Sequence, residues 1–206
     1  VKNKNMRKIN GNPLLSYTIK QAINSKLFKR VVVSTDSKII GDTSKKYGAE
    51  FFFLRSKKLA TDNSAKIPSI RDTLFKTEKK YNELYDIIID LDVTSPLRNI
   101  NDIKLALNKF LIKKSSLLFS VTKSKKNPYF NMVFKKNNKF LKVKNSGIIN
   151  SRQKSPLIYD MNASIYIWKR DTLIKKNNLF IKNNDIYEMP ESRSIDIDNE
   201  FDFKLI

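Results

Sequence analysis

The chain has 206 residues, with 41 Lys and Arg against 20 Asp and Glu, a net charge of +21, and neither Cys nor His. This length allows one domain with a substantial core. The missing residue types exclude disulfides, thiolate or histidine metal sites, and Ser-His-Asp catalysis. Any chemistry must therefore use carboxylates, Lys, Arg, Tyr, backbone donors or a bound metal. No apolar run is long enough for a transmembrane helix and no secretory signal is visible, so we expect no membrane partner.

The strong positive charge has two interpretations, a nucleic-acid footprint or a Lys- and Asn-rich composition with solvated surfaces. The Lys residues are spread along the whole chain, and no basic segment is interleaved with aromatic residues as in stacking platforms. This favours the compositional interpretation, so we expect no nucleic-acid partner. A positive field would still help to recruit anionic small substrates.

Helical and extended patterns alternate over the first half of the chain. A helix is predicted from Asn12-Pro13, where Asn suits the cap and Pro the first turn, and another ends at Lys46 before Gly48. Buried strands are predicted at Val31–Val33, Phe51–Leu54 and Tyr85–Leu91. A helix is predicted between the last two strands, over Ser64–Tyr81, with Pro68 in its first turns.

The second half begins with the same alternation of helices and strands, which ends after residue 123. A helix starting at Asn101-Asp102 and a strand over Ser116–Val121 complete a βαβα pattern, which predicts an α/β fold with a mostly parallel sheet between helices on both faces. After residue 123 we expect a hairpin turned at Asn137-Asn138, then a strand over Ser164–Trp168. The expected organisation is a single domain, 1–206, with an insertion or flap at about residues 125–160.

Two acidic residues near the end of the chain are the main chemical signal. In the run Ser194-Ile195-Asp196-Ile197-Asp198, strand alternation sends both aspartates to the same face. Neighbouring carboxylates repel each other unless a cation or protons lie between them, and Mg²⁺ holding a phosphate is a natural occupant. The alternative is a strand end with two solvated aspartates.

Five further segments, taken together, resemble the acylneuraminate cytidylyltransferases, which are the CMP-sialic acid synthetases and their legionaminic and pseudaminic acid relatives. The opening Lys-Asn resembles the end of the nucleotide loop of that family. The other matching elements are Leu54-Arg55 with Leu59–Asp62 and Ser64, Leu91–Arg98, Ser151–Gln153 with Tyr159 and Asn162–Tyr166, and Met189–Asp198 with Phe201 and Phe203. Their order and spacing cover essentially the whole chain, although each element alone would be a weak signal.

The resemblance implies a three-layer, Rossmann-like nucleotidyltransferase sheet with a small β-rich dimerisation flap. Two departures from the family pattern matter. The Gly-rich loop, with its basic residues for the triphosphate, has no counterpart before Val1, and neither has the first strand. Asp92-Val93 stands where the family usually has Gln-Pro, a form that resembles the legionaminic branch.

By this resemblance, a nucleotide site lies at the carboxyl ends of the strands, where ligands bind in open α/β sheets. Asn5 and Arg55 would contact cytidine, and Lys4 would neutralise phosphate charge. The full nucleotide set is Lys4, Asn5, Arg55, Ala60, Thr61, Asp62, Ser64, Asp92 and Thr94. Arg98 would bind the substrate carboxylate or brace the next helix. Gln153, Tyr159 and Asn162 would line the sugar side, whereas Tyr166 suits core packing.

The implied reaction transfers CMP from CTP to the anomeric hydroxyl of an acidic nine-carbon sugar, with release of pyrophosphate. Asp196 and Asp198 would bind Mg²⁺, Asp198 could also accept the hydroxyl proton, and Lys4 completes the catalytic set. We also expect a homodimer, formed through the flap at Tyr129–Phe140, and a cytoplasmic location, where CTP is found.

Three alternatives remain at this point. The acceptor could be 3-deoxy-manno-octulosonic acid. The chain could be a basic nucleic-acid-binding α/β protein, which would have no use for Asp196 and Asp198. It could also be inactive as it stands. Because the first strand and the phosphate loop have no counterpart here, we expect these 206 residues alone to bind substrates without turning them over.

Overall fold

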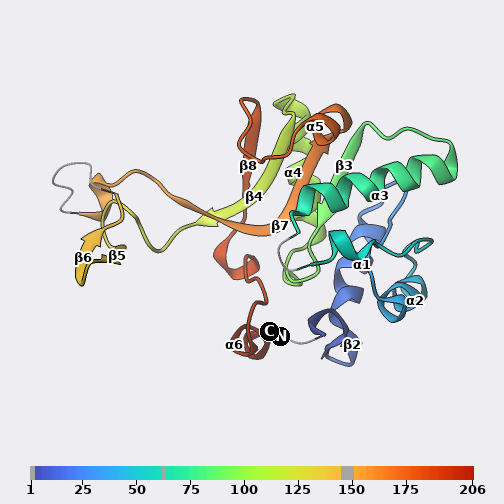
Figure 1. The fold of residues 1–206 in the computed structure, drawn as a ribbon, viewed down its shortest axis with the longest axis horizontal. Helices are drawn as coiled ribbons and strands as arrows, with labels where there is room; N and C mark the ends of the chain where they lie inside the picture. The colour runs from blue at the N-terminus through green and yellow to red at the C-terminus, as the bar shows by residue number, and fades with distance from the viewer. Residues whose placement is uncertain (1–2, 62–63, 145–150) are drawn as a thin grey trace.

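A four-stranded sheet forms the centre of the protein, with strand order β3-β7-β4-β8 (Figure 1). The computed structural model describes residues 3–61, 64–144 and 151–206. Within these ranges β3 (Ile87–Leu91), β4 (Leu117–Lys123) and β8 (Asn184–Glu188) run in one direction. The inner strand β7 (Tyr159–Lys169) is antiparallel to both β3 and β4.

The sheet is therefore mixed, and the prediction of a mostly parallel sheet holds only for the shared direction of β3, β4 and β8. The α/β class itself is confirmed. The difference arises after β4, where the chain leaves the sheet as a long excursion, and the described residues of this excursion contain no α-helix that could serve as a crossover. A chain that returns along the strand it has just left must run antiparallel to it.

Helices cover both faces of the sheet, because alternate residues of β4 and β7 point to opposite sides. Leu117, Phe119, Tyr166 and Trp168 pack with residues of α3 (Lys66–Tyr81) and α5 (Arg170–Lys175). Leu118, Ile165 and Ile167 pack against α4 (Ile100–Ile112) on the other face. The remaining elements are α1 (Leu14–Ser25), α2 (Lys38–Lys46), α6 (Glu200–Leu205), β1 (Lys8–Ile9), β2 (Asn12–Pro13), η1 (Lys4–Met6), η2 (Lys57–Leu59), η3 (Arg152–Lys154) and η4 (Glu191–Arg193).

The predicted helices are present, with small shifts at their ends. Asn99 caps α4 through a reciprocal capping box with Asp102, so this helix begins one residue before the predicted start. Pro68 lies in the first turn of α3, where a proline is tolerated. Asn12 does not cap α1, because Asn12-Pro13 pairs with Lys8–Ile9 in a two-stranded ribbon.

The predicted strands at Val31–Val33 and Phe51–Leu54 are extended segments without regular strand pairing. Their one bridge joins Val32 and Glu50 in the parallel sense, flanked by Val33 N to Glu50 O at 2.9 Å and Glu50 N to Val31 O at 2.7 Å. Neither segment pairs with β3 in the described part of the chain. The prediction of two buried strands of the main sheet was thus wrong in its pairing.

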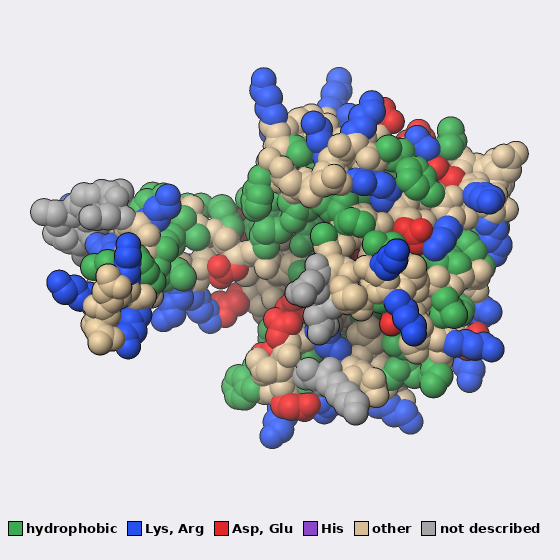
Figure 2. Space-filling view, in the orientation of Figure 1, with side chains coloured by type: hydrophobic (Ala, Val, Ile, Leu, Met, Phe, Trp, Pro, Cys, Tyr) green, Lys and Arg blue, Asp and Glu red, His purple; other side chains and the backbone are tan. Residues whose placement is uncertain are grey.

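An arm, which we define as residues 124–158 between β4 and β7, projects from the body of the protein (Figure 1). The predicted hairpin lies within it as β5 (Val133–Lys136) and β6 (Lys139–Lys142). Its turn residues Asn137 and Asn138 both have positive φ, as a tight two-residue turn requires. Apolar and basic side chains lie together on the arm (Figure 2).

Lys and Arg side chains are scattered over the face drawn in Figure 2 and do not gather in one stripe. This distribution is the one that the compositional interpretation of the charge predicts. None of the helices in the described part of the chain has the length and apolarity to cross a bilayer.

One residue of β7 has a strained backbone. Ala163 has φ +53°, a left-handed conformation that alanine adopts at a cost, and it lies where β7 changes register against β4. Asn82, at the end of α3, has a similar φ of +51°, which asparagine tolerates better.

We expect Ala163→Gly to raise the free energy of unfolding by up to about 1 kcal/mol, because relief of the strain outweighs the larger entropy of the unfolded chain. The matched control Asn82→Gly should change it by less than about 0.5 kcal/mol. Urea unfolding followed by circular dichroism measures both. A loss of stability in Ala163→Gly would show that the methyl group contributes more through packing than its conformation costs.

Candidate active site

Three distant segments meet beyond the carboxyl end of β3. The turn at residues 92–95 follows β3 directly, and its Thr94 carbonyl accepts a hydrogen bond from Ile197 N at 3.0 Å. Lys4, in η1, donates from Nζ to Ile197 O at 3.0 Å and lies 3.7 Å from Asp198 Oδ1. The structure thus brings Lys4, Thr94 and Asp198 together, although they are far apart in the sequence.

Asp196 and Asp198 flank Ile197, which is completely buried. The segment is not a regular strand, so the strand alternation on which the sequence prediction rested does not describe it. The Asp198 side chain is 74% exposed, whereas Asp196 is partly buried and its Oδ1 has no hydrogen-bond partner among the described residues. Burial raises the pKa of Asp196, and the negative charges of Asp198 and Asp92 raise it further. A hydrogen bond from Thr94 lowers this pKa but does not outweigh the other effects.

This pair has the chemistry of a divalent cation site. A buried carboxylate oxygen without a donor, next to a second carboxylate, suits a hard cation such as Mg²⁺, which prefers oxygen ligands and keeps several waters. No cluster of three or more acidic ligands suited to a metal occurs in the described ranges, so the protein would offer the cation Asp196 and Asp198.

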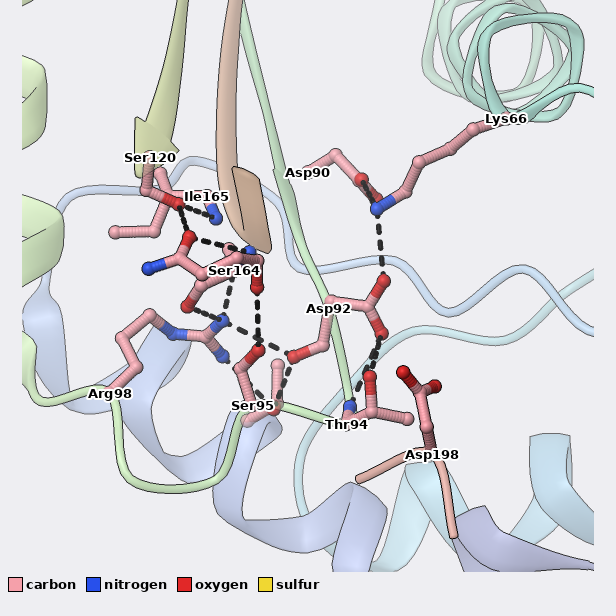
Figure 3. Close-up of polar contacts among 12 residues, drawn as sticks. Lys66, Asp90, Asp92, Thr94, Ser95, Arg98, Ser120, Ser164, Ile165 and Asp198 are labelled. Carbon is pink, nitrogen blue, oxygen red and sulfur yellow. Dashed lines mark hydrogen bonds and ion pairs between the residues drawn. The ribbon is translucent and has the colours of Figure 1, made fainter. Parts of the chain in front are cut away.

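A second acidic pair lies nearby and is already neutralised. The Lys66 ammonium, at the first residue of α3, is 2.9 Å from Asp90 Oδ2 and 3.0 Å from Asp92 Oδ2 (Figure 3). The other oxygen of Asp92 accepts hydrogen bonds from Thr94 N at 3.2 Å and Thr94 Oγ1 at 3.0 Å. Burial alone would raise the pKa of Asp92, but the Lys66 charge and the Thr94 hydrogen bonds outweigh it and lower the pKa.

Lys66 and Asp90 were not among the site residues predicted from the sequence. A signal was available for both. Asp90 lies two residues before Asp92 in a strand, so the two can share a face. A lysine at the first residue of a helix is placed against the helix dipole, which indicates that something else holds it there.

A cavity of about 960 Å³ opens beside β3 and collects most of the predicted nucleotide residues. Its lining includes Asn5, Arg55, Ala60, Thr61, Ser64 and Asp92. Thr94 bonds to the lining residue Asp92, Lys4 precedes the lining residue Asn5 in the chain, and Asp62 lies outside the described residues. Five buried polar atoms of lining residues form no hydrogen bond within the described structure: Asn5 Oδ1, Arg30 Nε, Ser34 Oγ, Arg55 Nε and Asp90 Oδ2, of which the last lies 2.9 Å from the Lys66 ammonium. Such atoms are rare unless a ligand or water satisfies them, so this part of the cavity suits a polar ligand.

Arg98 is buried and turned inward, which fits the bracing role. Its guanidinium donates to the carbonyls of Asp92 at 3.2 Å and Ser164 at 2.6 Å, to Thr18 Oγ1 at 3.0 Å and to Gln21 Oε1 at 3.2 Å. Burial lowers the pKa of Arg98 to about 10, so the group stays charged at neutral pH.

The predicted sugar-side residues do not converge in this chain. Asn162 is buried, accepting from Ser120 Oγ at 2.6 Å and donating to Ser194 Oγ at 3.0 Å. Tyr159 packs at the edge of the core, and Tyr166 lies within it, as its apolar strand predicted. Gln153 is exposed on the arm, in η3, and is not among the residues that line the cavity.

An ion pair between a buried aspartate and a partly exposed arginine anchors the segment that carries Asp196 and Asp198. Arg193, just before it, donates Nε to Asp102 Oδ2 and Nη2 to Asp102 Oδ1, both at 2.8 Å. Asp102 is completely buried at the start of α4. Burial by itself would raise the pKa of Asp102, but the bonds from Arg193 and from the Asn99 amide outweigh it, so the pKa is lowered.

Residues 1–204 match the cytidylyltransferase family. The chain belongs to this family. It is 48% identical over all 206 residues to a CMP-N,N'-diacetyllegionaminic acid synthase of Campylobacter jejuni, of which it covers 87%. It is 46% identical to post-translational flagellin modification protein B of Campylobacter coli, with the same coverage. This membership confirms the resemblance drawn from the sequence motifs.

The fold of this cytidylyltransferase is similar to that of a solved CMP:2-keto-3-deoxy-manno-octonic acid synthetase in complex with CTP. The TM-score is 0.65, and the match covers 92% of this chain and 84% of the other at 16% identity. At this identity the similarity concerns the fold, and it confirms a nucleotidyltransferase-type α/β architecture.

We expect the Asp102–Arg193 pair to give a pH-dependent contribution to stability. Because the folded pKa of Asp102 is lowered, the contribution is complete above the unfolded value of about 3.9 and is lost as the pH falls through the folded pKa. Asp102→Asn should lower the free energy of unfolding at pH 7 by about 2 kcal/mol and flatten its decline below about pH 4. Urea unfolding between pH 2 and pH 7 measures both effects, and an unchanged acid slope would contradict this role of Asp102.

Proposed function

We propose that this protein transfers CMP from CTP to the anomeric hydroxyl of a nonulosonic acid, of the legionaminic type, and releases pyrophosphate. The observation that carries the proposal is the meeting of Lys4, Asp196 and Asp198 near Asp92, which itself lines the cavity along β3. The relatives at 46% and 48% identity support the reaction and the acceptor class.

In this proposal the polar end of the cavity binds the nucleotide. Asn5 and Arg55 each have an unsatisfied buried polar atom there, which suits recognition of the base and ribose. Ser64 and Thr61 bond to each other, so that they form a preorganised wall with Ala60. Asp62 and Thr94 complete the proposed nucleotide set.

Lys4 and the two terminal aspartates then carry the chemistry. Lys4 neutralises phosphate charge as a point cation. Asp196 and Asp198 hold Mg²⁺, which, when bound, offsets the charge that builds up on the α-phosphate. Asp198, the more exposed of the two, accepts the proton of the anomeric hydroxyl as that oxygen attacks phosphorus and pyrophosphate leaves.

The acceptor itself is assigned on the relatives, with sialic and pseudaminic acids as neighbouring possibilities. The octulosonic acid alternative is supported by a similarity of fold alone. No observation favours the nucleic-acid-binding alternative, since the basic side chains form no stripe on the face seen in Figure 2. We propose a cytoplasmic location, because CTP is found there.

The apolar part of the same cavity supports the expectation of a further strand. It lies between β3 and the extended segment Val31–Thr35, with α1 residues such as Ile19 and α3 residues such as Leu74 along its walls. Among the described residues β3 pairs only with β7, so its other edge faces this space. An apolar strand parallel to β3 would fill the slot, cover two unpaired backbone edges and lead into Asn3–Met6. We propose that chain upstream of Val1 supplies it, together with the phosphate loop.

We expect pyrophosphate release from CTP and Mg²⁺ with one acid of a panel of sialic, legionaminic, pseudaminic and octulosonic acids. The 206 residues alone should bind CTP without turnover, and the same chain with its upstream segment should be active. In the active protein Asp198→Asn should lower kcat by about 100-fold or more, since a metal ligand contributes several kcal/mol to the transition state.

The matched control is Asp42→Asn, because Asp42 is also an exposed carboxylate 3.7 Å from a lysine, Lys45, but lies on α2. It should retain full activity. No release with any acid from a folded, extended chain would contradict the proposed reaction, and turnover by the 206 residues alone would contradict the role given to the upstream segment.

We also propose that the arm forms a homodimer interface and brings Gln153 to the sugar site of the partner subunit. The hairpin exposes Val133 and Phe140 on one face and Phe134 and Leu141 on the other, with Phe140 71% exposed, and exposed apolar side chains of this kind are covered by partners. Gln153 is exposed on the same arm and is not among the residues that line the cavity of its own chain, so a site shared between two chains would give it a role.

We expect the protein to sediment at twice its 24.0 kDa mass at micromolar concentration. Phe140→Asp should shift it to the monomer, because a buried unpaired charge is costly at an interface. Ile39→Asp, at a residue of α2 that is 72% exposed, should remain dimeric. A wild-type monomer at this concentration would contradict the proposal.

A further inference from the structure

Lys66 is held in a cage of two carboxylates and one aromatic ring. Its Nζ is 2.9 Å from Asp90 Oδ2, 3.0 Å from Asp92 Oδ2 and 4.4 Å from the centre of the Tyr166 ring. The negative charges of Asp90 and Asp92 outweigh the cost of partial desolvation and raise the pKa of Lys66, whose side chain is 38% exposed. The ammonium is therefore a permanent cation at the end of β3.

Interactions within helix α3 do not account for a lysine at this position. Lys66 is the first residue of α3, and the first turn contains no acidic residue that would pair with it within the helix. A cation there opposes the helix dipole. The contacts that hold it all come from the sheet, as Figure 3 shows for its reach from α3 to Asp90 and Asp92.

Two pairs of aspartates thus lie near the end of β3, and they differ in how closely a lysine ammonium approaches their carboxylates. Asp90 and Asp92 share the Lys66 ammonium at hydrogen-bond distance. Asp196 and Asp198 have only Lys4, at 3.7 Å from Asp198, and the buried Oδ1 of Asp196 has neither a hydrogen bond nor a cation at such a distance among the described residues, whereas Oδ2 of Asp90, also without a hydrogen bond, has Lys66 at 2.9 Å. Both pairs consist of aspartates two residues apart, so without Lys66 they would offer similar oxygen ligands to a divalent cation.

We propose that Lys66 restricts divalent-cation binding to Asp196 and Asp198, because its own ammonium occupies the place between Asp90 and Asp92. This inference rests on the proposed function only for the assignment of the cation to Asp196 and Asp198. A tethered ammonium is always present, and a divalent ion could enter the pair only by displacing it against its charge repulsion.

The same contact gives Lys66 a positioning role. One oxygen of Asp92 faces Lys66 while the other accepts both hydrogen bonds from Thr94, whose carbonyl in turn bonds Ile197 N. A divalent cation that took both oxygens of Asp92 would compete with the Thr94 hydrogen bonds on Oδ1, whereas Lys66 contacts Oδ2 alone. Lys66 therefore separates the carboxylates that shape the turn from those that bind the metal.

The test counts bound Mn²⁺, a spectroscopic substitute that shares the preference for carboxylate ligands. Electron paramagnetic resonance of free Mn²⁺ is recorded without nucleotide, because CTP binds the ion itself. We expect one bound ion for the wild-type chain and two for Lys66→Met. The charge-preserving Lys66→Arg should bind one, and the double variant Lys66→Met with Asp90→Asn should return from two ions to one.

A folded Lys66→Met that binds no more ions than the wild type would overturn the inference, as would two ions on the wild-type chain. No ion on the wild type but one on Lys66→Met would support it, and would instead contradict the metal role of Asp196 and Asp198. If thermal unfolding shows that Lys66→Met is not folded, the number of bound Mn²⁺ ions is measured on Lys66→Gln, which keeps a polar group near the carboxylates. The same numbers then support or contradict the inference.

Discussion

The Arg98 guanidinium is the contact on which the geometry of the site depends. It lies buried under the turn at residues 92–95 and donates to α1, to the end of β3 and to β7 at once. A planar group with fixed donor directions tolerates little displacement of its acceptors. The turn that carries Asp92 and Thr94 is therefore set relative to the sheet before any ligand is present, and the segment carrying Asp196 and Asp198 is placed against that turn by the hydrogen bond from Ile197 to Thr94.

The aspartates around the site have distinct environments. Asp102 is bound in bidentate fashion by Arg193, and Asp90 and Asp92 share Lys66. Asp196 and Asp198 alone among these residues lack a close-bonded cation. Because a basic protein has ample lysine for such pairing, the incomplete neutralisation of this pair is a local property of the fold and does not follow from composition. It leaves negative charge where the proposed reaction needs a metal.

Much of the fold and site could be predicted from sequence, since helix periodicity, caps and the Asn137-Asn138 turn are local signals. Most of the residues that the family motifs suggested for the nucleotide line one cavity beside β3. The direction of β7 could not be predicted, because it depends on how the chain returns from the arm. The inward orientation of Arg98 and Asn162 was equally hidden, because their partners lie on other elements: Thr18 and Ser164 for Arg98, Ser120 and Ser194 for Asn162. Lys66 was missed because its partners, too, lie on the sheet.

The contact between Lys4 and Ile197 spans 193 positions of the sequence. During synthesis on the ribosome the nascent chain can therefore form its helices and much of the sheet, but it cannot complete this site until Asp198 has left the exit tunnel. Contacts of such long range are also closed late and slowly in folding, because the loop entropy must be lost first. A released, unfinished chain would thus be a folded body without a catalytic centre.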